Sequence, residues 1–254
     1  MNKAKKVEES EKHLIQNKLI SLFRKKLLTW YAKNGRCFSW RKSSVSKYQL
    51  IISELLLQRT RAETVDSFFS SFISHFPSWK KLSNANESEI SKIIKPIGLW
   101  KRRASTLKRL ATIMAKKNGR FPKRKADIEA LPGVGQYIAN AILLLCHGEA
   151  QPLLDVNMAR VLERVFGPRK LADIRYDPYL QELASRAIKC KEAKKLNWAI
   201  LDLAALHCLS RKKRCNDCPL KTICSDAQKN SIPKGNGISP HGETKTSLDL
   251  RRNG

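Results

Sequence analysis

Apolar residues recur along most of the chain at the three- and four-residue spacing of an amphipathic helix. The clearest runs lie at 14–28, 50–72 and 161–166. No segment shows the strict alternation of a strand bounded by hairpin dipeptides. Proline and glycine interrupt the pattern often enough to leave room for about ten helices of ordinary length. The sequence therefore predicts an all-α fold.

The two ends of the chain differ from the middle. Residues 1–12 are highly charged and lack a helical apolar stripe. Residues 225–254 are rich in serine, glycine, proline and charge, and poor in large apolar side chains. Because such segments cannot bury enough apolar surface to offset the entropy of ordering, we expect both to be disordered.

The charge balance points to a polyanionic partner. The 254 residues include 50 Lys and Arg against 22 Asp and Glu, which gives a formal net charge of +28. Residues 101–125, beginning with Lys101, Arg102 and Arg103, hold eleven basic residues and no acidic one. A run this unbalanced repels itself, which favours nucleic acid as the partner, ahead of an acidic membrane surface.

A membrane or secretory role is not expected. The most apolar stretch, Ile138–Cys146, is far shorter than the roughly 20 residues of a spanning helix. The first residues also lack the apolar centre of a signal peptide. We expect a soluble intracellular protein, in which the seven cysteines stay reduced.

A proline- and glycine-rich turn forms the first candidate site. Pro132 should end one helix, and another should start near Gln136 with free N–H groups pointing outward. Such a terminus binds anions, so a DNA phosphate fits there without any base being read. The alternative is an ordinary corner between two helices. The segment comprises Leu131, Pro132, Gly133, Val134, Gly135 and Gln136.

Four cysteines form the second candidate site. Cys208, Cys215, Cys218 and Cys224 follow the pattern C-x6-C-x2-C-x5-C. Four thiols this close in a reduced protein indicate a metal centre, and both zinc and an iron–sulfur cluster are chemically possible. The spacing does not decide between them. The other three cysteines stand alone and are interpreted as packing residues.

Two carboxylates have both a structural and a chemical interpretation. Asp155 precedes a helical run and suits the N-cap position, yet it also lies where an acid could act, one helix beyond the turn. Glu54 shares an apolar helix face with Leu50 and Leu57. It is either half of a buried ion pair, with Arg61 as a candidate partner, or a general acid with a raised pKa at a pocket wall.

Taken together, these segments resemble the helix-hairpin-helix DNA glycosylases of the endonuclease III superfamily. The resemblance runs over about residues 37–224 and is carried by several motifs in order: FSWRKSSVSKYQLIISELLLQRTRAETV, IGLWKRRASTLKRLA, ALPGVGQYIANAILLLCHGE, LLDVNMARVLERVFG, LNWAILDLAALHC and the four-cysteine pattern.

The resemblance implies a fold of two helical lobes. Residues 43–149 would form a six-helix barrel with the helix-hairpin-helix at 128–147. Residues 13–42 and 150–224 would form a lobe that holds one 4Fe-4S cluster on the four cysteines. Mismatched double-stranded DNA would lie across the cleft between the lobes.

The resemblance also implies roles for single residues. Asp155 matches the family aspartate that stabilises the oxocarbenium-like sugar and helps to activate water. Glu54 matches an acid of the adenine and mismatch branches, and the turn of Gln58, Arg59 and Thr60 matches the segment that wedges into the duplex. The target base would be flipped out of the stack.

Tyr137 places the chain within the superfamily. Bifunctional members have a Schiff-base lysine where this chain has Tyr137, and tyrosine cannot form an imine. The chain is most similar to the MIG-type mismatch glycosylases, which implies a monofunctional enzyme that removes T or U opposite G. The sequence carries no sign of an oligomer, so we expect a monomer by default. Two alternatives stay open: a MutY-type adenine glycosylase acting on A:G or A:8-oxoguanine, and a non-catalytic iron–sulfur protein that binds DNA.

Overall fold

The computed structural model describes residues 3–229, and the regular structure in this part of the chain is all helical. It contains twelve α-helices and three short 3-10 helices, and no strand is formed within it. The all-α prediction is confirmed. No helix in the described range combines the length and apolarity that a membrane crossing requires.

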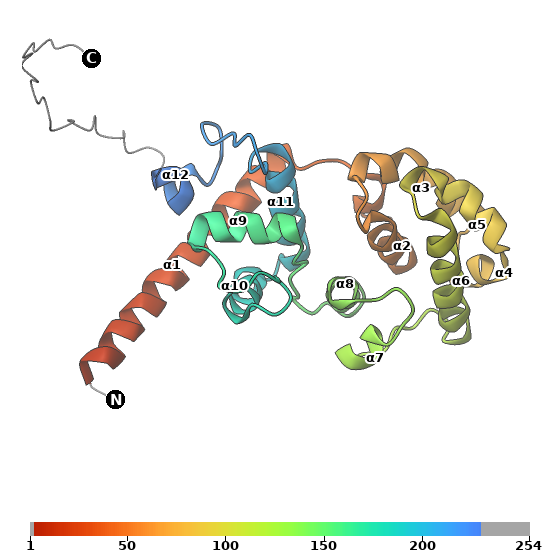
Figure 1. Cartoon of the computed structure of the whole chain (residues 1–254), viewed down its shortest axis with the longest axis horizontal. Coiled ribbons are helices and arrows are strands. Elements are labelled where there is room, and N and C mark those ends of the chain that lie inside the picture. Colours follow the sequence, from red (N-terminus) through yellow and green to blue (C-terminus); the bar gives the residue numbers. More distant parts are fainter. Residues whose placement is uncertain (1–2, 230–254) are drawn as a thin grey trace, which may run out of the picture.

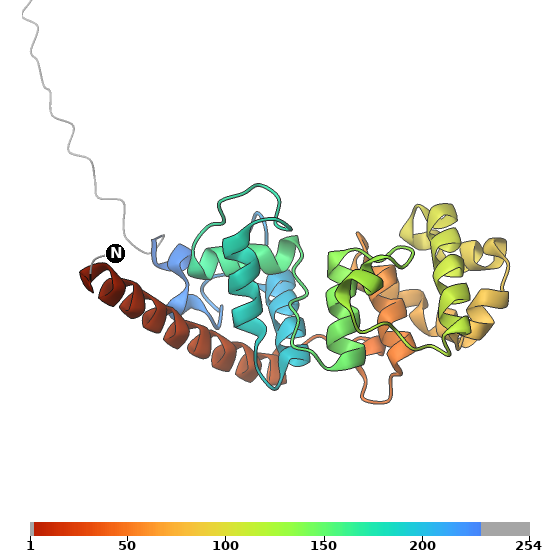
Figure 2. The same ribbon diagram turned by 90° about the horizontal axis from the view of Figure 1, so that it is seen from below.

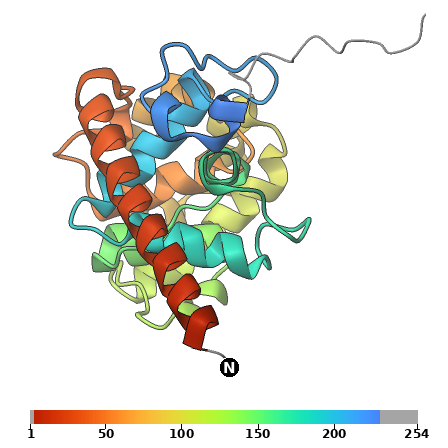
Figure 3. The same ribbon diagram turned by 90° about the vertical axis from the view of Figure 1, so that its left-hand side faces the viewer.

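The first helix group joins the N-terminal helix to the C-terminal half of the chain (Figures 1 and 2). Helix α1 packs on α10 and α11, and α9 packs on α10, α11 and α12. Figure 3 shows α1 running diagonally across this group. The members are α1 (Lys3–Asn34), α9 (Val156–Phe166), α10 (Pro178–Ile188), α11 (Ala193–Leu206) and α12 (Ser225–Lys229).

The second helix group is a continuous stretch of the chain. Helices α4 and α5 pack on α6, while α8 packs on α2 and α7. Its helices are α2 (Lys47–Leu57), α3 (Ala62–His75), α4 (Trp79–Asn84), α5 (Glu87–Ile94), α6 (Trp100–Lys116), α7 (Lys125–Glu129) and α8 (Gln136–His147), with the 3-10 turns η1 (Ser39–Arg41) and η2 (Lys95–Ile97) beside them.

Two buried asparagines fix the segment that joins the two groups. Asn140 of α8 donates from Nδ2 to the carbonyl of Pro152 at 2.9 Å. Asn197 of α11, which is fully buried, accepts from the N–H of Leu153 at 2.7 Å. Because the segment is tied to both groups, the start of α9 is held beside the start of α8.

Both ends of the chain contain more helix than the sequence indicated. Helix α1 begins at Lys3, within the expected disordered N-terminus, because its lysines, alanines and glutamates are good helix formers. Helix α12 occupies Ser225–Lys229, the start of the expected tail. Ala227 is buried there, and the Ser225 hydroxyl donates to the carbonyl of Val165 at 2.8 Å. The rest of that tail, residues 230–254, lies outside the described range.

Candidate active site between the helix groups

A cleft of about 890 Å³ opens between the two helix groups. Its walls come from the end of α2, the turn that follows it, the start of α8, the residues around Asp155, and one face of α11. Glu54, Tyr137 and Asp155 all line it. Three residues that are far apart in the sequence are therefore gathered around one space.

Glu54 and Tyr137 form a hydrogen-bonded pair in the cleft wall. The Tyr137 hydroxyl, on the first turn of α8, donates to Oε2 of Glu54 at 3.1 Å. Glu54 is only 4 % exposed. Burial raises the pKa of Glu54 to about 7, although the Tyr137 hydrogen bond and the charge of Arg41 oppose this. No ion pair joins Glu54 to Arg61 in the described structure, so that alternative is wrong.

Asp155 is both the N-cap of α9 and a wall of the cleft. Its Oδ1 accepts from the N–H groups of Asn157 at 2.9 Å and Met158 at 2.8 Å. Its Oδ2 accepts from Nδ2 of Asn157 at 2.6 Å. The capping interpretation is confirmed, and these three donors hold the carboxylate in one orientation at the cleft.

A cationic group forms the wall on the side of α11. Asp202, fully buried, accepts from Nε of Arg36 and from Nη1 of Arg41, both at 2.7 Å. Nε of Arg41 is buried with no hydrogen-bond partner among the described residues. The guanidinium of Arg41 also lies 5.2 Å from the ring of Trp198. This group places a fixed positive charge near Glu54.

This cationic group was not predicted from the sequence. The residue that could have indicated it is the acid at position 202, within the apolar run LNWAILDLAALHC. An acid inside such a run needs a buried partner. The partners, however, lie more than 160 positions away, at the end of the segment before α2.

The turn after α2 is held by an arginine. Arg59 has a φ of +56°, in the left-handed region. Arg103 donates to the carbonyls of Leu56 at 3.1 Å and Gln58 at 2.5 Å, and to the Thr60 hydroxyl at 3.2 Å. Gln58, Arg59 and Thr60 line the cleft, and their role as a DNA wedge stays a prediction. Arg103 was expected to contact DNA, but its guanidinium is engaged with this turn.

The neighbours of Arg103 occupy a different place. Lys101 and Arg102 are exposed on the first turn of α6 and do not line the cleft. The opposite face of α6 buries an apolar stripe that includes Leu107, Leu110 and Met114. Lys101 and Arg102 therefore lie on the exposed side of an amphipathic helix.

Helix α8 begins at Gln136, directly after the glycine-rich turn, as the sequence predicted. Gly133 has a φ of +76°, and a Cβ there would lie 2.4 Å from Cγ2 of Thr106, so only glycine fits. A Cβ at the exposed Gly135 would meet nothing within 4 Å. Leu131 and Val134 were expected to contact DNA, but their side chains are buried at 8 % and 7 % exposure. Their N–H groups bond to the carbonyls of Ile128 and Leu131, both at 3.1 Å, and contact with DNA at these positions stays a prediction.

The four cysteines line one small cavity in the first helix group. Arg164 of α9 lies against it, since its Nη1 donates to Sγ of Cys208 at 3.2 Å and its carbonyl accepts from Sγ of Cys224 at 3.3 Å. Among the described residues, no three histidine, cysteine or acidic side chains are close enough to hold a single metal ion. The four cysteines thus line one common space.

The chain belongs to the family described as HhH-GPD superfamily base excision DNA repair protein, whose pattern matches residues 52–183. A thymine-DNA glycosylase of Aeropyrum pernix is 37 % identical over 210 residues, which are 81 % of this chain and 94 % of that protein. A thymine/uracil-DNA glycosylase of Pyrobaculum aerophilum is 34 % identical over 82 % of this chain and 92 % of its own.

Solved structures agree with the fold. The structure of a thermostable thymine-DNA glycosylase superimposes with a TM-score of 0.77 at 32 % identity, over 84 % of this chain and 98 % of the other. A non-covalent endonuclease III–DNA complex gives a TM-score of 0.71 at 19 % identity, a likeness of fold alone. An adenine DNA glycosylase of Buchnera aphidicola is 31 % identical, but this chain spans only 58 % of its length.

Proposed function

We propose that this protein is a DNA glycosylase that releases T or U opposite G from double-stranded DNA. The observation that carries the proposal is the meeting of Glu54, Tyr137 and Asp155 in one cleft. The relatives named thymine or thymine/uracil glycosylases match over more than nine-tenths of their own length, which supports the pyrimidine substrate.

Asp155 and Glu54 have different roles in the proposed hydrolysis. Asp155, held by three hydrogen bonds, stabilises positive charge on the sugar as the N-glycosidic bond breaks. Glu54, with a pKa of about 7, carries a proton in about half of the molecules at pH 7, and this protonated form gives the proton to the leaving base. Water adds to the sugar carbon and loses its proton to Asp155. The products are a free base and an intact strand with an abasic site.

The enzyme is expected to be monofunctional, because no described residue that lines the cleft is a lysine. Without an amine, the sugar carbon cannot form the imine that precedes strand cleavage. A Tyr137→Lys variant tests this directly. It should form an adduct with a T:G duplex that borohydride traps, whereas the parent protein should form none. Absence of the adduct in the variant would place position 137 away from the sugar.

Asp155→Asn separates catalysis from binding. The variant keeps the side-chain oxygen that caps α9 but loses the charge, so it should bind a T:G duplex and release no base. Base release at the parental rate would refute the mechanism. If the parent protein itself releases no base yet binds mismatches, the non-catalytic alternative is correct.

The cysteine cavity can take a 4Fe-4S cluster, because all four cysteines line it. Zinc is the alternative, since one zinc ion also binds four thiolates. Cys208, Cys215, Cys218 and Cys224 would hold the cluster and cross-link the segment after α11. The test is iron, sulfide and zinc content per chain: four irons with sulfide support the proposal, and one zinc contradicts it. Cys215→Ser should lower the iron content.

We propose that the protein acts on DNA inside the cell as a monomer, the default for one enzyme that works on one lesion. Sedimentation of the protein bound to one duplex tests the stoichiometry. A single chain per duplex is the expected result, and two chains per lesion would contradict it.

A further inference from the structure

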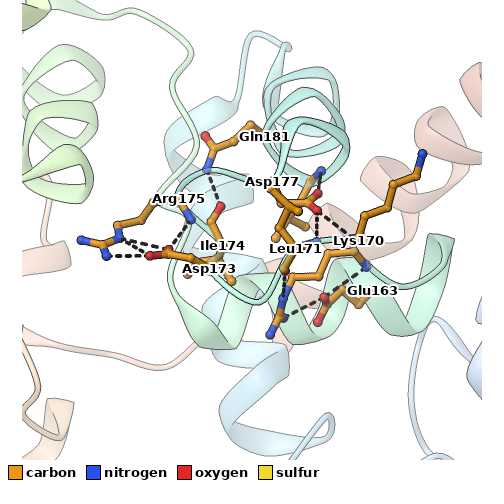
Figure 4. Close-up of polar contacts among 10 residues, drawn as sticks. Glu163, Lys170, Leu171, Asp173, Ile174, Arg175, Asp177 and Gln181 are labelled. Carbon is orange, nitrogen blue, oxygen red and sulfur yellow. Dashed lines mark hydrogen bonds and ion pairs between the residues drawn. The ribbon is translucent and has the colours of Figure 1, made fainter.

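The connection between α9 and α10 is an ordered loop held by several hydrogen bonds (Figure 4). It has no part in the proposed hydrolysis. Residues 167–177 contain no helix. Asp177, fully buried, nevertheless fixes the first half of the loop, because its Oδ2 accepts from the N–H groups of Lys170 and Leu171, both at 2.7 Å. The tip at 173–176 therefore has a defined position.

The tip lies at the mouth of the cleft. Ile174 and Arg175 line the same cleft as Asp155. Gln181 of α10 ties the tip to the glycine-rich turn, since its Nε2 donates to the carbonyl of Ile174 at 2.8 Å and its Oε1 accepts from Nε2 of Gln136 at 3.3 Å. The tip is thus coupled to the first residue of α8, the end of the helix that offers its N–H groups to an anion.

The tip presents a cation beside an exposed aromatic ring. Tyr176 is 68 % exposed, and the guanidinium of Arg175 lies 5.3 Å from its ring. Asp173 engages one edge of that guanidinium, at 3.0 Å from Nε and 2.6 Å from Nη2. Nη1 of Arg175 has no hydrogen-bond partner among the described residues, and Figure 4 shows the guanidinium pointing away from the loop.

We infer that Arg175 and Tyr176 bind the DNA strand that carries the target nucleotide, next to the point where this nucleotide leaves the duplex. The free edge of the guanidinium suits a phosphate, and the tyrosine ring can stack on the flanking base that extrusion uncovers. The inference rests on the proposed function, because it takes DNA as the substrate. It assigns this strand because Ile174 and Arg175 line the same cleft as Asp155, the carboxylate proposed to face the sugar of the target nucleotide.

Binding to an uncleavable substrate tests the inference with the full-length protein. The duplex contains a T:G pair whose thymidine is 2′-fluorinated, which resists hydrolysis. Arg175→Ala should weaken binding about tenfold and reduce the salt slope of log K by about 0.9, the value of one lost phosphate contact. Tyr176→Ala should weaken binding about tenfold without changing the slope, while Tyr176→Phe should keep the affinity within about twofold.

Asp173→Asn separates a DNA contact from a structural role. The variant keeps the side-chain oxygen that accepts from the N–H of Arg175 at 2.9 Å, but removes a negative charge beside the proposed phosphate. Binding should therefore tighten, opposite in sign to Arg175→Ala. If both variants weaken binding equally, the pair only shapes the loop and the inference is overturned.

A control variant accounts for the loss of charge alone. Lys80 is exposed on α4, at the far end of the molecule from α9 and α10 in Figure 1. Lys80→Ala removes one positive charge and should leave the slope unchanged. An Arg175→Ala slope equal to that of Lys80→Ala would overturn the inference.

Base release by the parent protein, measured in parallel, separates the two proposals. Weakened binding in the Arg175 and Tyr176 variants supports this surface even if no duplex loses a base. Unchanged binding in an active enzyme overturns the surface and leaves the proposed function standing.

Discussion

Replacing Glu54 by glutamine should stabilise the folded protein at pH 8, although it removes the proposed general acid. The pKa of Glu54 is about 7 in the folded protein, against 4.5 for an ordinary glutamate. The folded state therefore binds more protons than the unfolded state between these values. Since stability rises with pH only where the unfolded state binds more protons, this group makes the free energy of unfolding fall as pH rises from about 4.5 to 7.

The size of the effect follows from the same two values. At pH 8 the buried carboxylate costs the folded state about 3 kcal/mol, and at pH 5 only about 1 kcal/mol. Glutamine carries no charge at either pH and still accepts the Tyr137 hydrogen bond. Glu54→Gln should therefore gain about 3 kcal/mol at pH 8 and about 1 kcal/mol at pH 5.

Urea unfolding followed by far-ultraviolet circular dichroism at both pH values measures the gain. Glu129→Gln, at the exposed end of α7, is the matched control and should change stability by less than about 0.5 kcal/mol at either pH. A gain of equal size at pH 5 and pH 8, or a loss at pH 8, would refute the account of Glu54 as a buried acid with a raised pKa.

Three further outcomes are expected. Single-turnover base release should fall about tenfold between pH 6 and pH 8, as the proton on Glu54 is lost; a profile that is flat over this range would show that the proton is not used. Gly133→Ala should cost about 1 kcal/mol or more in urea unfolding, because of its positive φ and the clash with Thr106. Gly135→Ala should leave stability within about 0.5 kcal/mol but weaken duplex binding; equal stability losses in the two glycine variants would contradict this. Arg103→Ala should free the turn after α2 and reduce base extrusion, read from 2-aminopurine fluorescence beside the target, with binding to undamaged duplex little changed; parental fluorescence would exclude a positioning role.

Local patterns in the sequence predicted the parts of the structure that depend on neighbours in the chain. The start of α8 at Gln136 follows from proline and glycine placement, and the N-cap at Asp155 follows from its position before an amphipathic run. The unusual place of Glu54 was visible because an acid interrupts an apolar face. In each case the cause lies within one or two helical turns.

Partners across the fold could not be read in the same way. Glu54 bonds Tyr137, 83 positions away, rather than the nearby Arg61, because α2 packs on α8. Arg103 turns toward Gln58 for a similar reason, since α6 begins beside the turn that follows α2. Helix α12 was not predicted, because the polar composition of residues 225–254 indicated disorder. The burial of Ala227 depends on contacts with distant residues and cannot be read from that composition.

The most direct test of the central claim is base release from end-labelled duplexes that contain T:G, U:G, A:G or A:8-oxoguanine, each with and without hot alkali. The account predicts strand cleavage only after alkali, and only at T or U opposite G. Release of adenine would move the protein to the adenine branch. Cleavage without alkali would contradict a cleft with no lysine among the described residues that line it.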